Sequence, residues 1–297
     1  GGTVGDIESL PYVESVRQLC WERRDDCAVV HLTLIPYLSA AGELKTKPTQ
    51  HSVKSLQESG VFPDVLVCRT EYEINEIIRR KLALFCNVQS DAVIQSIDAN
   101  TIYDVPKLMK EERLDQVVLK KLGLDSIGEV DITLWEEFVF NIKNPKAEVD
   151  IALIGKYVEL KDSYKSISES FIHASSFSRC KVNLHWIHSE KLNTDTVEDE
   201  LKNMDGILIA PGFGNRGIEG KIHGVRYARE NKIPFLGICL GMQVSVIEYA
   251  RNVLHYKDAN STEMDAKTTF PVIDLMEDQK TVSSMGGTMR LGSCKCD

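Results

Sequence analysis

Short apolar runs alternate with amphipathic helical segments along this chain, and the alternation limits its fold more than any other feature. In the first half, strand-like runs are expected at 27–35, 63–69 and 92–97, and helical patterns at 49–59, 75–85 and 115–122. Thr49 is expected to cap the first of these helices. Strands that alternate with helices form parallel sheets with helices on both faces, so we expect an α/β fold.

A polar stretch at 124–149 interrupts the alternation, and a second series starts at residue 150. Doubly wound α/β domains carry their sites at the carboxyl ends of the strands. We therefore expect two three-layer parallel-sheet domains, 1–123 and 150–297, joined by a linker with one helix. In the second domain, strands are expected at 151–157, 181–187, 206–210 and 234–238, and helices at 163–176, 218–231 and 240–252.

Composition narrows the class of protein. With 43% hydrophobic and 27% charged residues, the chain can form a packed core. A net charge of −9 argues against duplex DNA or an anionic membrane surface as partner. The aromatic residues do not alternate with basic ones, and no apolar run is long enough to cross a bilayer. Eight cysteines without paired spacing suit a reducing compartment, so we expect a cytoplasmic protein.

The two ends of the sequence suggest a part of something longer. The chain starts at Gly1 without a methionine and stops at Asp297, soon after a glycine-rich stretch. We therefore expect a piece of a larger protein, truncated at both ends.

The sharpest chemical signal is Gly237-Ile-Cys239-Leu-Gly241, where an apolar strand runs directly into a helix. A nucleophile between two glycines at such a junction is the pattern of a nucleophile elbow, here with cysteine in place of serine. The N–H groups of the helix should favour the thiolate, and the Leu240 N–H should face an oxyanion. The alternative is a buried structural cysteine between packing glycines.

A second glycine-rich loop, Pro211–Gly217, follows the preceding strand and matches G-x-G-x-x-G. A dinucleotide site would also need an acidic residue near the end of the next strand, and that strand ends at Cys239 instead. We therefore expect this loop to add an N–H donor to the oxyanion site, from Gly212 or its neighbour. A plain tight turn remains the alternative.

Charged residues elsewhere suggest ligand sites. Lys45, Lys47 and Gln50 lie in one loop ahead of a helix and could hold a triphosphate, with Lys81 as a third cation. Glu263 could bind an ammonium group and Arg290 a carboxylate. Surface lysines and turn residues are the alternatives for all of these.

Several of these motifs resemble those of a known enzyme family. The segment around Cys239 resembles the nucleophile segment of class I glutamine amidotransferases, and Pro211–Gly217 resembles their oxyanion loop. More narrowly, the chain is similar to the CTP synthase family along nearly its whole length. The stretches that carry this similarity are GGTVGDIE (1–8), KTKPTQ (45–50), ALFCNV (83–88), IYDVP (102–106), GKYVELKDSYKS (155–166), DANSTE (258–263) and MGGTMRLG (285–292).

The resemblance implies the carboxyl-terminal part of a P-loop-like amidoligase (synthase) domain, followed by a class I glutaminase domain. In that family ATP phosphorylates the O4 atom of UTP, and ammonia from glutamine displaces the phosphate to give CTP. Mg²⁺ accompanies ATP, with its ligands expected upstream of Gly1 and none in this chain. GTP is the activator, CTP the feedback inhibitor, and the assembly a homotetramer that can extend into filaments.

The family's functional residues carry over position by position. Cys239 corresponds to the glutaminase nucleophile. The resemblance assigns UTP or CTP binding to Asp6, Ile7, Glu8, Lys45, Thr46, Lys47, Pro48, Thr49, Gln50 and Lys81, and ATP adenine binding to Ile97, Asp98 and Ala99. It assigns the oxyanion and glutamine contacts to Gly212, Leu240, Gly241, Met242, Gln243, Glu263 and Arg290.

The chain also departs from the family pattern. Pro211 stands where the family usually has glycine, which removes one N–H donor. In the family, the general base histidine and its carboxylate follow the MGGTMRLG stretch, and all seven histidines here precede it. No P-loop of the G-x-x-x-x-G-K type is present either. We therefore expect the chain alone to be inactive.

Two rival functions stay open: a glutaminase that serves another acceptor, or an inactive nucleotide-binding or filament module. A metal site at Cys294-Lys-Cys296 is not expected, because no second pair lies at zinc-like spacing.

Overall fold

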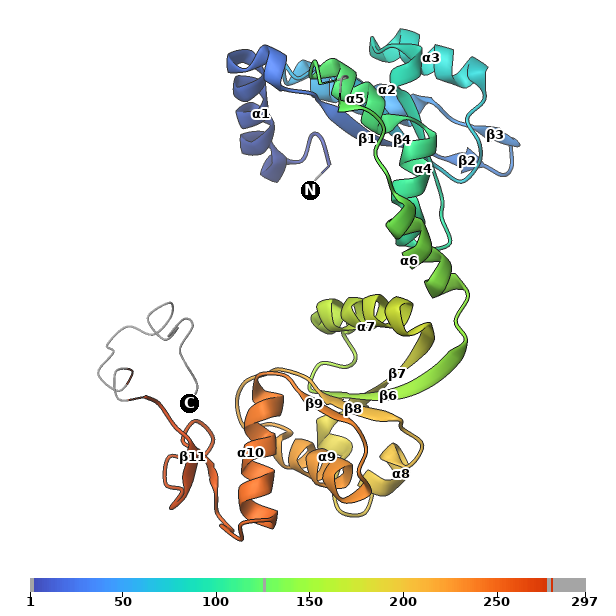
Figure 1. Cartoon of the computed structure of the whole chain (residues 1–297). Coiled ribbons are helices and arrows are strands. Elements are labelled where there is room, and N and C mark those ends of the chain that lie inside the picture. Colours follow the sequence, from blue (N-terminus) through green and yellow to red (C-terminus); the bar gives the residue numbers. More distant parts are fainter. Residues whose placement is uncertain (1–2, 125–126, 277–278, 280–297) are drawn as a thin grey trace. The chain divides into compact units, whose positions relative to one another are not determined.

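The structure is a computed structural model that describes residues 3–124, 127–276 and 279. The chain divides into two compact units, 1–139 and 140–297, and the division falls inside helix α6 (Thr133–Lys143). Each unit is described by itself below (Figure 1).

Unit 1 is built on a parallel sheet of three strands in the order β1-β4-β5. A short antiparallel hairpin, β2–β3, follows β1. The strands are β1 (Val30–Ile35), β2 (Tyr37–Leu38), β3 (Glu43–Leu44), β4 (Val65–Thr70) and β5 (Val93–Ile97). The helices are α1 (Leu10–Glu22), α2 (Lys47–Glu58), α3 (Glu76–Cys86), α4 (Val105–Glu111) and α5 (Leu114–Lys121).

The central strand β4 explains the three layers of unit 1, because successive strand residues point to opposite faces. Leu66 and Cys68 pack in one cluster with residues of α2 and α3. Val65 and Val67 pack in another with residues of α4 and α5. Strand β1 is covered on one face only: Leu32 and Leu34 point outward and are 66% and 56% exposed.

Unit 2 contains a parallel sheet of four strands in the order β7-β6-β8-β9. Its strands are β6 (Ala147–Gly155), β7 (Cys180–His188), β8 (Gly206–Ile209) and β9 (Phe235–Gly237), and a small pair of strands, β10 (Asn260–Ser261) and β11 (Pro271–Ile273), lies apart from this sheet. Its helices are α7 (Lys165–Ser178), α8 (Val197–Leu201), α9 (Ile218–Asn231) and α10 (Leu240–Asn252).

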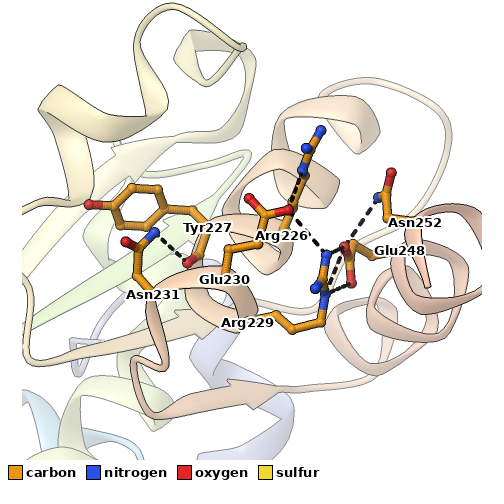
Figure 2. A network of polar contacts seen from close by, with 7 residues as sticks. All are labelled: Arg226, Tyr227, Arg229, Glu230, Asn231, Glu248 and Asn252. Atoms are coloured by element: carbon orange, nitrogen blue, oxygen red, sulfur yellow. Dashed lines mark hydrogen bonds and ion pairs between the residues drawn. The ribbon is translucent and has the colours of Figure 1, made fainter.

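Helices also cover both faces of the unit 2 sheet. Figure 1 shows α7 on one side of the sheet, and α8 and α9 on the other. Leu153 and Leu208 pack with residues of α7, whereas Ile154 and Ile209 pack with residues of α8, α9 and α10. Helices α9 and α10 are joined by the guanidinium of Arg229, which binds the buried carboxylate of Glu248 (Figure 2).

The structure confirms the α/β class and the parallel sheets, and it corrects two expectations. Helices α1 and α4 were not expected from the sequence. The threonine cap at Thr49 is wrong: α2 begins two residues earlier, with Pro48 in its first turn. The buried hydroxyl of Thr49 instead donates a hydrogen bond to the carbonyl of Leu34, at 3.1 Å, and so anchors α2 to β1.

Candidate active site at the β9–α10 junction

Cys239 lies between the end of β9 and the first residue of α10, and its side chain is exposed. Its backbone has φ 54° and ψ −107°, a positive φ that residues with side chains rarely adopt. Such strain persists only where the surrounding structure holds it, and it concentrates at functional positions. Because the Cys239 side chain is exposed, the alternative of a buried structural cysteine is wrong.

The two glycines around Cys239 are required by close backbone contacts. A Cβ atom on Gly237 would lie 2.5 Å from the carbonyl carbon of Gly241, so the strand end and the helix start could not approach as they do. A Cβ atom on Gly241 would lie 2.3 Å from the carbonyl oxygen of Ile209 in β8. The G-x-C-x-G spacing thus fixes the turn that presents the sulfur.

The loop Pro211–Gly217 lies beside this turn. A Cβ atom on Gly212 would lie 3.6 Å from Cδ2 of Leu240. The ammonium group of Lys156 donates hydrogen bonds to the carbonyls of Phe213 and Gly214. On the other side of the loop, the N–H of Gly214 donates to Oε1 of Glu263 at 3.4 Å, so the structure brings Glu263 to the glycine-rich loop.

A second lysine lies beneath the same loop. The side chain of Lys221, in the first turn of α9, is fully buried, and its ammonium group donates a hydrogen bond to the carbonyl of Ala210 at 2.9 Å. Burial lowers the pKa of Lys221 to about 8, with a further decrease from the nearby charge of Lys156 and a smaller opposing effect of Cys239. Burial also lowers the pKa of Lys156, and Arg216 adds to that decrease.

The low pKa of Lys221 predicts how stability depends on pH. Between pH 8 and the ordinary pKa of 10.5, the unfolded chain binds a proton that the folded chain has released, so the free energy of unfolding rises with pH in this range. The gain is up to about 3 kcal/mol, and it is absent from a Lys221→Met chain. Urea unfolding of both chains at pH 7 and pH 10 measures it. The same pH dependence in both would contradict the assignment.

The remaining residues expected to bind glutamine fall in different environments. Leu240 is buried, but its N–H belongs to the first turn of α10, where backbone donors lack intrahelical partners. Met242 is exposed, and Gln243 is half-buried one helical turn after Cys239. Arg290 and the pair Cys294 and Cys296 lie outside the described residues.

In unit 1, cationic residues of the expected nucleotide site gather around Glu43. The ammonium of Lys45 makes an ion pair with this carboxylate. The pKa of Glu43 is lowered by the hydrogen bond and charge of Lys45, and the charge of Lys81 adds to the effect. The structure therefore brings Lys45, which follows β3, and Lys81, in α3, near the carboxylate of Glu43.

The other expected UTP contacts lie at the start of α2. The expectation that Lys47 and Gln50 belong to a loop ahead of the helix is therefore wrong. Gln50 donates a hydrogen bond to Oγ1 of Thr46, the residue that precedes α2, at 3.2 Å. Lys47 and Pro48 are exposed at the start of α2, whereas the side chain of Thr49 is buried and engaged with β1. Any contact of Thr49 with a nucleotide would thus come from its backbone.

The first expected nucleotide segment forms a local turn. The N–H of Thr3 donates to Oδ2 of Asp6 at 3.0 Å, and the exposed residues Ile7 and Glu8 begin a short 3₁₀ helix.

The expected adenine contacts lie where β5 ends, at the carboxyl edge of the unit 1 sheet. Ile97 is the last residue of β5, and Asp98 and Ala99 follow it. The carboxylate of Asp98 is 3.3 Å from Nε of Arg69 in the neighbouring strand β4. This is the edge at which parallel sheets bind ligands.

Sequence reasoning missed both buried lysines of unit 2. Lys221 could have been found, because Ile218, Ile222 and Val225 mark the core face of α9 and Lys221 falls on the same face. Lys156 follows directly after β6.

Among residues 3–124, 127–276 and 279, no group of three or more histidine, cysteine or acidic side chains could hold a metal ion. No helix in these ranges is long and apolar enough to span a membrane.

Comparison with known proteins shows which sequences this chain resembles. A family model described as "CTP synthase N-terminus" matches residues 1–124, and one described as "Glutamine amidotransferase class-I" matches residues 159–297. A protein of Flavobacterium psychrophilum named CTP synthase is 67% identical over all 297 residues of this chain. Over its whole length the chain is similar to proteins named CTP synthase. The chain spans about half of its curated relatives, 55% in the case of the Flavobacterium protein.

Other relatives of the family are similar over the same length. CTP synthase of Porphyromonas gingivalis is 58% identical, again over the whole of this chain and 55% of that protein. Among solved structures, the glutaminase domain of Trypanosoma brucei CTPS with bound acivicin is 39% identical. The match covers 43% of this chain and 50% of that one, with a TM-score of 0.42.

Proposed function

We propose that this chain provides the glutaminase nucleophile and much of the nucleotide site of a CTP synthase, which aminates UTP to CTP at the expense of ATP and glutamine. The observation that carries the proposal is the exposed, strained Cys239 at the strand–helix junction, in a chain whose relatives bear that name. The proposal is also supported by the position of the glycine-rich loop and Glu263, which lie together beside the junction.

The glutaminase step follows from this arrangement. The Cys239 thiolate attacks the carboxamide carbon of glutamine, and the negative charge on the amide oxygen is stabilised by backbone N–H groups of Leu240 and of the loop at Gly212. The nitrogen of the tetrahedral intermediate takes up the proton that the thiol had lost, and the intermediate then expels ammonia and leaves a glutamyl thioester. Water hydrolyses the thioester to glutamate and returns the thiol. Glu263 would hold the α-ammonium group of the substrate, and Arg290 its α-carboxylate.

In unit 1, Lys45 and Lys81 would bind the triphosphate of UTP, or of CTP as inhibitor, together with Asp6, Glu8 and the start of α2. Residues 97–99 would contact the adenine of ATP. Mg²⁺ would arrive with ATP and neutralise its phosphates, held by groups outside this chain. GTP as activator, a homotetramer that can form filaments, and a cytoplasmic location are also proposed, on the family likeness alone.

The proposal is tested by labelling Cys239. A glutamine analogue with a diazo-ketone group should alkylate the wild-type protein once, with loss of N₂, and free glutamine should protect it. Cys239→Ala should abolish the labelling, whereas Cys180→Ala, at a half-exposed cysteine of the same unit, should leave it unchanged. Measurement of the intact mass shows whether the wild-type protein and each variant carry the label. Labelling that is independent of Cys239 would refute the glutaminase assignment.

A second measurement separates CTP synthase from a glutaminase that serves another acceptor. ATP consumption by the intact, full-length protein, followed with and without UTP in the presence of glutamine, should depend on UTP. ATP turnover that does not depend on UTP would favour a glutaminase that serves another acceptor.

A further inference from the structure

Burial of the Lys221 ammonium group carries a cost in folding free energy. Its side chain is fully buried, and in the described part of the chain its ammonium makes no ion pair with a carboxylate, only the hydrogen bond to Ala210. Burying a charge without a counter-charge costs free energy, and an apolar side chain of similar length would fill the same space more stably. Packing therefore does not explain why a lysine occupies this face of α9.

The surroundings of the ammonium point to the candidate active site. Ala210 follows β8 directly and precedes the glycine-rich loop. A Cβ atom on Gly212 would lie 3.7 Å from Nζ of Lys221 and 3.6 Å from Cδ2 of Leu240, so the ammonium and the start of α10 flank the same glycine. The ionisable groups that act on Lys221 are Lys156, from the end of β6, and Cys239, from the elbow.

We propose that Lys221 is a positioning residue of the glutaminase site, which holds the backbone of the oxyanion loop beside the elbow and faces Cys239 with a buried positive charge. The proposal deepens the glutaminase function proposed above and rests on it.

Two physical effects would follow from this placement. Because a peptide unit is planar, a fixed Ala210 carbonyl also fixes the direction in which the chain enters Pro211 and Gly212. In addition, a cation in a poorly solvated position stabilises nearby negative charge, first on the sulfur and then on the amide oxygen of the intermediate. Lys156, with its bonds to Phe213 and Gly214, would hold the far end of the loop in the same way.

The test measures the reactivity of Cys239 directly, without glutamine turnover. The full chain is treated with iodoacetamide, whose carbon is attacked by the thiolate as iodide leaves, and peptide mass spectrometry separates Cys239 from the other cysteines. Rates are measured from pH 6 to pH 9 for wild type, Lys221→Met, Lys221→Arg and the control Lys202→Met, an exposed lysine paired with Asp199. Urea unfolding at pH 7 accompanies each variant.

We expect Lys221→Met to slow the alkylation of Cys239 at pH 7 about tenfold relative to wild type. Its unfolding midpoint should be equal to or above that of wild type. Lys221→Arg should keep a pH–rate profile close to wild type, and Lys202→Met should change nothing.

An unchanged profile in a folded Lys221→Met chain would overturn the proposal. A Lys221→Met chain that is clearly less stable than wild type at pH 7 would also overturn it, because the lysine would then serve the fold. Failure of the glutamine-analogue labelling, with the iodoacetamide effect present, would instead remove only the glutaminase function.

Discussion

Gly241→Ala is expected to destabilise unit 2 by about 3 kcal/mol or more. The added Cβ would lie 2.3 Å from the carbonyl oxygen of Ile209. Gly241 is in α10 and Ile209 ends β8, so neither backbone can move independently of its element. Helix α10 would have to shift away from β8, and the Cys239 turn would open with it. Urea unfolding should show a lower midpoint, and the glutamine-analogue labelling of Cys239 should be lost.

A matched control is available in the neighbouring helix. Gly224 also lies inside a helix, α9, but a Cβ atom there would meet Cδ1 of Ile154 at 2.8 Å, the end of a side chain that can rotate. Gly224→Ala also gains up to about 1 kcal/mol of helix propensity. We therefore expect Gly224→Ala to be far milder than Gly241→Ala, and equal effects would contradict the account of the elbow.

Arg229→Met is expected to destabilise unit 2 by about 3–5 kcal/mol, because it leaves the carboxylate of Glu248 buried without its partner. Only 1% of the Glu248 side chain is exposed, and three hydrogen bonds from the Arg229 guanidinium end on it. The remaining described donor is the amide of Asn252 (Figure 2). The free energy of unfolding in urea measures the loss.

The same network supplies the controls. Arg226→Met removes an exposed pair with Glu230 and should cost less than about 1 kcal/mol (Figure 2). Replacing both partners, in Arg229→Met/Glu248→Leu, should recover most of the stability, since no charge then remains buried. A double variant as unstable as Arg229→Met would show that the loss has another cause.

The fold was predictable where a segment contributes to a core. Both sheets and helices such as α9 and α10 were expected from apolar periodicity, because their inward residues are buried and recur regularly. Helix α1 was missed although Tyr12, Val16 and Leu19 recur at helical spacing, and in the structure none of its residues is buried. Thr49 misled because threonine suits a helix cap, whereas here a buried hydroxyl ties the helix to a strand.

The site was predictable where the backbone dictates the residue type. Gly237 and Gly241 are glycines because two backbones meet there, and that requirement is visible as a spacing in the sequence. Lys156 was not predicted, because lysine is ordinarily a surface residue. Lys221 was missed for the same reason, although its spacing places it on the core face of α9. The roles assigned to the nucleotide and glutamine contacts stay predictions.

The position of the Cys239 sulfur depends on main-chain geometry: the end of one strand, the start of one helix, and two close approaches that only glycine allows. Side chains in the surrounding loops do not determine where the reactive atom stands. Substitutions outside these close backbone contacts can therefore change the surroundings of Cys239 without moving its sulfur.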